Sequence, residues 1–125
     1  MREIKFRAKV LNIPDMEGEW ETTDEVGFVN FFHALKQGDL DEKTFGEYTG
    51  LKDKKRTKEF PEGQEIYEGD ILEFDVEEWA SAETNKFAVK WDKNYACFTG
   101  NGVVTEWREF CEAIGNIYDN PELLK

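Results

Sequence analysis

The sequence predicts a small, mainly-β protein of the α+β class, built on a twisted sheet or an SH3-like β-barrel core with one or two short helices. Three observations lead to this prediction: short segments alternate between apolar and polar residues, Gly- and Asn-containing turns separate them, and few segments have helical spacing. The 125 residues suit a single domain over 1–125. We expect a strand and a helical segment over 1–47 and the barrel-like core over 48–125.

The first predicted element is a strand over Glu3–Leu11. Apolar residues at positions 4, 6, 8 and 10 alternate with charged residues at 3, 5, 7 and 9. A period of two places the apolar side chains on one face of a strand and the charged ones on the other. We therefore expect a half-buried strand with a charged outer face.

The next apolar stretch predicts a helix over Asp24–Gln37. Thr22 followed by Glu25 fits a capping box at its start, and Gly38 fits its end. Apolar residues between them recur at helical spacing. A strand through residues 29–33 is the alternative interpretation.

Shorter elements follow from residue 40 onward, because the apolar runs are brief and turn residues separate them. We expect four core residues among them: Ile66, Tyr67, Ile71 and Leu72. Gly50 and Gly69 are expected at turns with positive φ. The predicted elements are an irregular segment or short strand at Leu40–Thr49, a loop at Gly50–Gly63, strands at Leu72–Val76 and Phe87–Trp91, a hairpin strand at Tyr95–Thr99, a helix at Thr105–Glu112, a strand at Ile114–Tyr118, and a helical turn from Pro121.

Charge is unevenly distributed along a chain whose formal net charge is −12. Such a charge disfavours nucleic-acid binding, because contacts to phosphates supply most of the non-specific affinity. A basic patch over Lys52–Lys58 is followed by an acidic run over Glu62–Glu78 that contains no basic residue. The candidate partner-binding residues from these two segments are Glu68, Asp70, Glu73, Asp75, Glu77, Lys54, Lys55 and Arg56.

Residues that carry enzymatic chemistry do not form a recognisable pattern. His33 is the sole histidine and Ser81 the sole serine, while Cys97 and Cys111 lack a metal-ligand spacing. Asp70 after Gly69 is the best single candidate for a perturbed carboxylate, although a turn-forming role is the stronger interpretation. We assign no catalytic, cofactor-binding or metal-binding residue, and expect no cofactor. A carboxylate- or metal-dependent enzyme is kept as an alternative.

Five sequence pieces, spread over the whole chain and covering about a third of it, resemble the YopX family of phage and prophage proteins. The pieces are MREIKFRA at 1–8, YTGLKDKK at 48–55, EIYEGDIL at 65–72, VKWD at 89–92 and IGNIYDNPELL at 114–124. The resemblance implies a mainly-β fold, a phage or prophage origin and a location in the bacterial cytoplasm. It implies no catalytic residue.

Two segments depart from the family pattern that this resemblance implies. Lys55–Gln64 is an insertion where the family has an Asn-Gly turn directly after Lys-Asp-Lys, and the Phe-rich segment Val26–Leu35 is not a family signature. If the protein has a function that the family lacks, we expect it in these two segments.

The residues and the resemblance together favour a non-enzymatic interaction protein that binds a host or phage protein. The acidic run is its expected surface. The alternative from another class is a single-stranded nucleic-acid binding module, using Lys52–Lys58 with exposed aromatics such as Trp20 or Trp91. No apolar stretch of about 18 residues occurs, so we expect no membrane partner. The sequence leaves the oligomeric state open.

Overall fold

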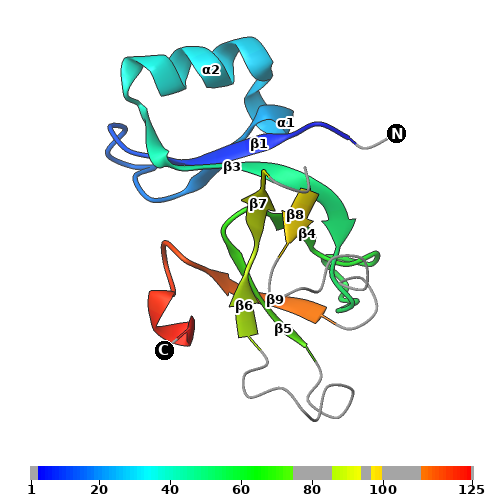
Figure 1. Ribbon diagram of the computed structural model, residues 1–125. Coiled ribbons are helices and arrows are strands. Elements are labelled where there is room, and N and C mark those ends of the chain that lie inside the picture. Colours follow the sequence, from blue (N-terminus) through cyan, green and yellow to red (C-terminus); the bar gives the residue numbers. More distant parts are fainter. Residues whose placement is uncertain (1–2, 75–85, 94–96, 100–110, 125) are drawn as a thin grey trace. The chain divides into compact units, whose positions relative to one another are not determined.

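Strands predominate in the computed structural model, which describes residues 3–74, 86–93, 97–99 and 111–124 (Figure 1). The mainly-β class with short helices is confirmed. The chain divides into two compact units, Met1–Tyr48 and Thr49–Lys125. Each unit is described by itself below.

The first unit contains the antiparallel strands β1 (Phe6–Val10), β2 (Trp20–Thr22) and the first part of β3 (Leu40–Lys52). Strand β1 lies between the other two, so that Ala8 faces Glu21 of β2 while Val10 faces Leu40 of β3. The predicted strand at Glu3–Leu11 is therefore confirmed in type, with the shorter bounds Phe6–Val10.

The charged face of the predicted Glu3–Leu11 strand differs from the prediction, because two of its side chains are covered. Lys5 and Arg7 are buried, although they lie opposite the apolar face. The Arg7 guanidinium lies 3.9 Å from the centre of the Trp20 ring, and the Lys5 ammonium is 2.9 Å from the Asp24 carboxylate. Aromatic rings and an ion pair thus take the place of solvent on this face.

The predicted helix forms in two pieces, α1 (Thr23–Val26) and α2 (Phe28–Gln37). Both predicted boundaries are confirmed: Thr22 accepts a hydrogen bond from the backbone N–H of Glu25, and Gly38 adopts the left-handed conformation after α2. The single continuous helix is wrong, because Gly27 has φ of 84° and interrupts it. The alternative strand is excluded.

The core of the first unit lies between α2 and the sheet. Phe31 has no exposed surface, and its ring lies 6.2 Å from that of Phe45 on β3. Phe6 of β1 stacks on Phe45 at 5.2 Å between centroids. The buried members of this core are Ala8, Val10, Phe31 and Leu40.

Strand β3 corrects the prediction of an irregular segment or short strand at Leu40–Thr49. It runs for 13 residues and so continues past Tyr48, the last residue of the first unit. It pairs with β1 and is hydrogen-bonded to β4 (Glu65–Tyr67). Gly50 has φ of 87° within it, which confirms the expected positive φ. The expected loop therefore begins after Lys52, not at Gly50.

The second unit is built from short strands and a 3₁₀ helix. Its three-stranded sheet has the order β6–β5–β9, and β7 pairs with β8 in a separate antiparallel hairpin. The predicted core residues Ile66, Tyr67, Ile71 and Leu72 are all buried. The further elements are β5 (Asp70–Phe74), β6 (Lys86–Ala88), β7 (Lys90–Asp92), β8 (Cys97–Thr99), β9 (Cys111–Asn116) and η1 (Pro121–Leu124).

Several predictions for this unit can be compared with its strands. Those at Leu72–Val76 and Ile114–Tyr118 are confirmed in type as β5 and β9, with the end of the first outside the described residues. The predicted Phe87–Trp91 strand is divided at Val89, whose N–H donates to the carbonyl of Asp70. The predicted helix at Thr105–Glu112 lies mostly outside the described residues, and its last two residues belong to β9.

Asparagine side chains shape the chain after β9, as expected. The Asn116 carboxamide oxygen accepts hydrogen bonds from the backbone N–H groups of Tyr118 and Asp119, at 3.0 and 2.9 Å. The predicted helical turn from Pro121 is confirmed as η1. The Asn120 side chain accepts from the N–H of Asn116 rather than from the turn it precedes.

Candidate functional site

The predicted acidic surface is only partly described, and its members have different environments. Asp70 is buried, and its Oδ2 accepts a hydrogen bond from the N–H of Tyr67 at 2.8 Å. Glu68 and Glu73 are half-buried. Asp75 and Glu77 lie outside the described residues. The described acids therefore do not form one exposed face, since Asp70 shapes the turn into β5.

The predicted basic residues are brought together on a single loop. Lys54, Lys55 and Arg56 lie between β3 and β4, and Lys55 and Arg56 are exposed. We call residues 54–63 the basic loop.

Asp53 anchors the basic loop at its base. This side chain is fully buried, and its two oxygens accept different backbone hydrogen bonds. One binds the N–H of Gln64 at 2.8 Å, and the other binds the N–H of Ala113 on β9 at 2.9 Å. The backbone N–H of Asp53 also donates to the carbonyl of Gln64 at 2.9 Å. We call this arrangement of Asp53, Gln64 and Ala113 the Asp53 clamp.

Gly63 permits the loop to close on the clamp. Its φ is 101°, a conformation that side chains rarely adopt, and a Cβ atom there would collide with the carbonyl oxygen of Asp53. The Arg56 guanidinium donates to that same carbonyl oxygen at 2.5 Å. The loop ends are therefore fixed by a buried carboxylate, a glycine and an arginine.

The outer part of the loop presents an aromatic side chain beside its cations. Thr57 and Phe60 exchange hydrogen bonds: the N–H of Phe60 donates to Thr57 Oγ1 at 2.9 Å, and the N–H of Thr57 donates to the carbonyl of Phe60 at 3.1 Å. Phe60 is 38% exposed. The loop thus combines positive charge with apolar surface.

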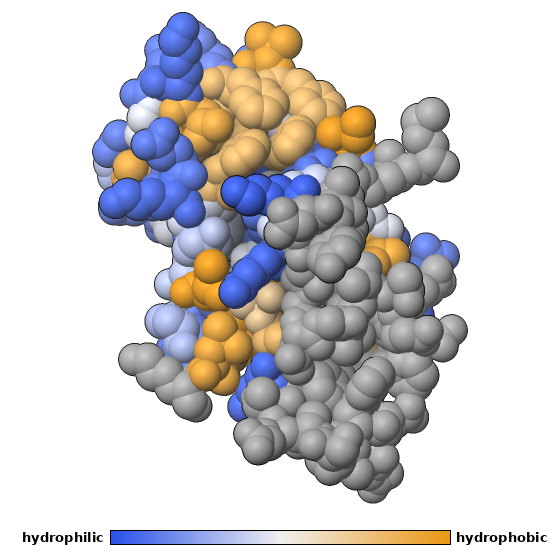
Figure 2. Space-filling view, in the orientation of Figure 1, coloured by the Kyte–Doolittle hydropathy of each residue, from blue (hydrophilic) through white to orange (hydrophobic). Residues whose placement is uncertain are grey.

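A second exposed feature lies on α2 in the first unit. Phe28, Val29 and Phe32 are exposed, and we call these three side chains the helix face. Phe28 and Phe32 also contact Phe6 of β1, with ring centroids 6.3 and 5.6 Å apart. Figure 2 shows apolar surface gathered over this part of the first unit. The Phe-rich segment singled out in the sequence therefore supplies both core and surface.

Cys111 is close to the clamp in sequence and space. The N–H of Lys54 donates to its carbonyl oxygen at 2.8 Å. Burial raises the pKa of the Cys111 thiol from 9.0 to about 11, while Lys54 lowers it and Asp53 raises it. The thiol is therefore protonated at neutral pH and is not an activated nucleophile.

The raised pKa of Cys111 predicts a specific loss of stability in alkali. Below pH 9 the thiol is protonated in the folded and unfolded chains, so its contribution is fully present. Between pH 9 and about 11 only the unfolded thiol ionises, and the free energy of unfolding falls. We expect Cys111→Ala to lose less stability than the wild type between pH 8 and pH 10, measured by urea denaturation. Equal losses would contradict the prediction.

The other titratable side chains of the described residues have separate environments. Within the described residues, no group of three His, Cys, Asp or Glu side chains could hold a metal ion. His33 is exposed on α2. The pKa of Glu21 is raised, first by partial burial and then by the carboxylates of Glu25 and Asp39. None of the helices in the described part of the chain is long and apolar enough to cross a membrane.

Sequence reasoning missed the role of Asp53, which it counted within a basic patch. The available signal was an acidic residue interrupting Lys52–Lys55, followed ten residues later by Gly63. That signal is compatible with a solvent-exposed loop, so it does not by itself predict a buried carboxylate.

The strands, the clamped loop and the helix face describe a small mainly-β protein with exposed charged and apolar side chains. A family model described as YopX protein matches residues 5–125. The chain therefore belongs to the YopX family.

A solved structure is similar to this one over the full length of both chains. The crystal structure of protein EF1440 from Enterococcus faecalis aligns with a TM-score of 0.51 and 22% sequence identity, covering 100% of each chain. At this identity the similarity concerns the fold. Comparison with curated proteins gives no match.

Proposed function

We propose that this protein is a non-enzymatic interaction protein whose basic loop binds an acidic surface on a host or phage protein. The expected setting is the cytoplasm of a bacterial host, because the sequence resembles phage and prophage proteins. The proposal concerns the second unit, which contains the basic loop.

The Asp53 clamp is the observation that carries this proposal. A loop of charged residues on a protein surface ordinarily samples many conformations, and ordering such a loop on binding costs free energy. Here the fully buried Asp53 carboxylate joins the two loop ends through the N–H of Gln64 and attaches them to β9 through the N–H of Ala113. The loop is therefore shaped before a partner arrives, which is typical of binding loops on a rigid scaffold.

The side chains of the loop suit an acidic protein partner. Lys55, Arg56 and Lys58 are exposed, and Phe60 adds apolar surface beside them. Arg and aromatic residues are enriched among the residues that dominate binding energies at protein interfaces. A nucleic acid is disfavoured more strongly than a local acidic patch, because it is charged along its whole length and the net charge of −12 repels each phosphate.

The test is a pull-down of the tagged protein from bacterial lysate, with and without nuclease, analysed by mass spectrometry. The variant carries Lys54→Gln, Lys55→Gln and Lys58→Gln, and keeps Arg56 because its guanidinium contacts the Asp53 carbonyl. We expect a protein partner that survives nuclease and is recovered about tenfold less with the variant, because several charge contacts are lost together.

A matched control variant removes the same charge at exposed lysines elsewhere. It carries Lys43→Gln, Lys90→Gln and Lys93→Gln. The control should recover the partner as the wild type does. A partner that disappears with nuclease would indicate that the basic loop binds nucleic acid and not a protein. Equal losses of the partner with both variants would contradict the proposal.

A further inference from the structure

Arg56 differs from its neighbouring lysines in the basic loop because its side chain is anchored. Its Nη1 donates a hydrogen bond to the backbone carbonyl of Asp53 at 2.5 Å. Gly63 leaves room for this contact, since a Cβ atom there would lie 2.9 Å from Nη1. The side chains of Lys55 and Lys58 make no hydrogen bond or ion pair with any residue that the structure describes. The loop therefore combines two unanchored ammonium groups with one anchored guanidinium.

The anchored guanidinium keeps one complete hydrogen-bonding edge. A guanidinium has five N–H donors in a planar fork. The contact with Asp53 uses Nη1, so the edge formed by Nε and Nη2 still offers two parallel N–H groups. Arg56 is exposed, and within the described part of the chain its guanidinium has no acceptor besides the Asp53 carbonyl. Two parallel N–H groups fit the two oxygens of a carboxylate.

The acids of the loop itself do not take this edge. Glu62 pairs with Lys52, whose ammonium lies 3.7 Å from the Glu62 carboxylate. Glu59 is exposed and forms no ion pair with Arg56 in the residues that the structure describes. The free edge of Arg56 is thus offered to a carboxylate from outside the loop.

We propose that Arg56 is the specificity-determining residue of the basic loop and binds an Asp or Glu carboxylate of the partner protein through its Nε–Nη2 edge. The inference rests on the proposed function, because it names the group that the basic loop recognises there. Phe60, 38% exposed on the same loop, gives an apolar side chain beside that carboxylate a surface to contact. The lysines attract an acidic surface, whereas Arg56 sets the geometry of the contact.

Anchoring explains why a lysine cannot replace Arg56 in this role. A long side chain loses conformational freedom when a partner binds it, and this loss weakens binding. The hydrogen bond to the Asp53 carbonyl has already restricted Arg56 before the partner arrives. The single ammonium of a lysine would have to serve both this carbonyl and the partner, and it cannot present two parallel donors. Arg56→Lys should therefore weaken binding although the charge of the loop is unchanged.

NMR titration of the full, isotope-labelled chain with the peptide acetyl-Gly-Glu-Phe-Glu-Gly-amide tests the proposal. The peptide offers carboxylates beside an aromatic side chain, and its few contacts predict a Kd on the order of 1 mM. We expect the Nε–H signal of Arg56, assigned by its absence in Arg56→Lys, to shift as the peptide is added. Arg56→Lys should raise the Kd about fivefold to tenfold.

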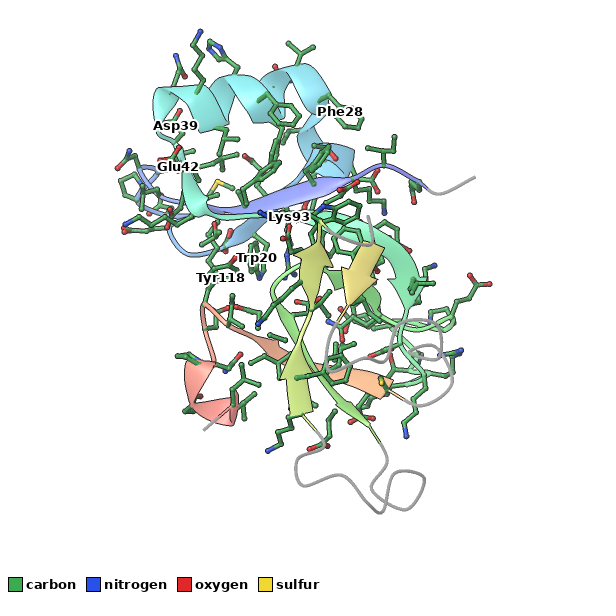
Figure 3. The ribbon with its side chains drawn as sticks, viewed as in Figure 1. Trp20, Phe28, Asp39, Glu42, Lys93 and Tyr118 are labelled. Carbon is green, nitrogen blue, oxygen red and sulfur yellow. The ribbon has the colours of Figure 1, made fainter. Side chains whose placement is uncertain are left out.

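Matched controls separate the fork from charge. Lys55→Arg exchanges the same two residue types at the next position and should change the Kd less than about twofold. Lys93→Gln removes a charge from an exposed lysine directly after β7 (Figure 3) and should leave the Kd unchanged. The peptide with Gln in place of Glu should not shift the Arg56 signal. Circular dichroism will show that Arg56→Lys is folded.

Three outcomes would overturn the proposal: an Arg56 signal that the glutamate peptide leaves in place, equal affinities of Arg56→Lys and the wild type, or tighter binding of oligothymidylate than of the peptide. The wild-type signal alone decides the first of these, so the test does not depend on the variant. In the pull-down from lysate, a partner lost with the lysine variant but retained by Arg56→Lys would leave the proposed function standing and refute this inference. A peptide bound through Arg56, with no partner lost on the lysine variant, would do the reverse.

Discussion

Asp53→Ala is expected to lower the free energy of unfolding by about 3–5 kcal/mol. The substitution removes both acceptors of the clamp, so that the N–H groups of Gln64 and Ala113 lose the carboxylate that binds them at 2.8 and 2.9 Å. Each buried donor left without a partner costs about 1–3 kcal/mol, and hydrogen bonds to a charged group lie at the upper end. Urea denaturation followed by tryptophan fluorescence will measure the loss.

Two further variants make this result specific. Asp53→Asn keeps one carbonyl acceptor and should cost about 1–2 kcal/mol, because a single donor is then deprived. Asp41→Ala is the matched control: Asp41 is only half-buried, its Oδ1 accepts the backbone N–H of Lys43 at 3.0 Å in a solvent-exposed hydrogen bond, and its loss should cost less than about 1 kcal/mol. Equal costs at positions 53 and 41 would show that burial of the carboxylate is not important for stability.

Phe31→Ala should destabilise the first unit by about 3–5 kcal/mol. Phe31 has no exposed surface, and its ring lies 5.3 Å from that of Phe32 and 6.2 Å from that of Phe45. Truncation removes the apolar area that attaches α2 to the sheet and leaves a cavity that a short helix cannot readily fill. Thermal and urea denaturation monitored by circular dichroism will measure the change.

The neighbouring Phe32 is the appropriate control for this effect. Its ring takes part in the same aromatic cluster but is 39% exposed, so Phe32→Ala should cost about 1–2 kcal/mol. If Phe32→Ala costs as much as Phe31→Ala, the side chain exposed at the surface carries as much of the packing as the buried one, contrary to the structure described here.

Local patterns in the sequence predicted those elements whose determinants lie close together in the chain. Alternation predicted β1 and β5, and the pair Thr22 and Glu25 with Gly38 predicted both ends of the helical segment. The positive φ of Gly69 and the burial of Ile71 followed from a turn leading into an apolar strand. In each case neighbouring residues alone determine the conformation.

Features that depend on distant partners could not be predicted in this way. Strand β3 has a weak pattern of its own and is extended because β1 and β4 pair with it. The burial of Asp53 requires Ala113, sixty residues away, and nothing near Asp53 distinguishes it from a solvated acid. The break at Gly27 had a local signal, yet a glycine within an apolar helical pattern is also compatible with a continuous helix.

The Asp53 clamp also constrains the order in which the protein folds during synthesis. The strands and helices of the first unit lie within residues 1–48 and can pair once that part has left the ribosome. The basic loop cannot reach its final shape until residue 113 is made, and β5 likewise lacks its partner β9 until then. Contacts between segments so distant in the chain form slowly. The nascent chain should therefore expose one edge of β5 until β9 is made, and an unpaired strand edge invites aggregation during that interval.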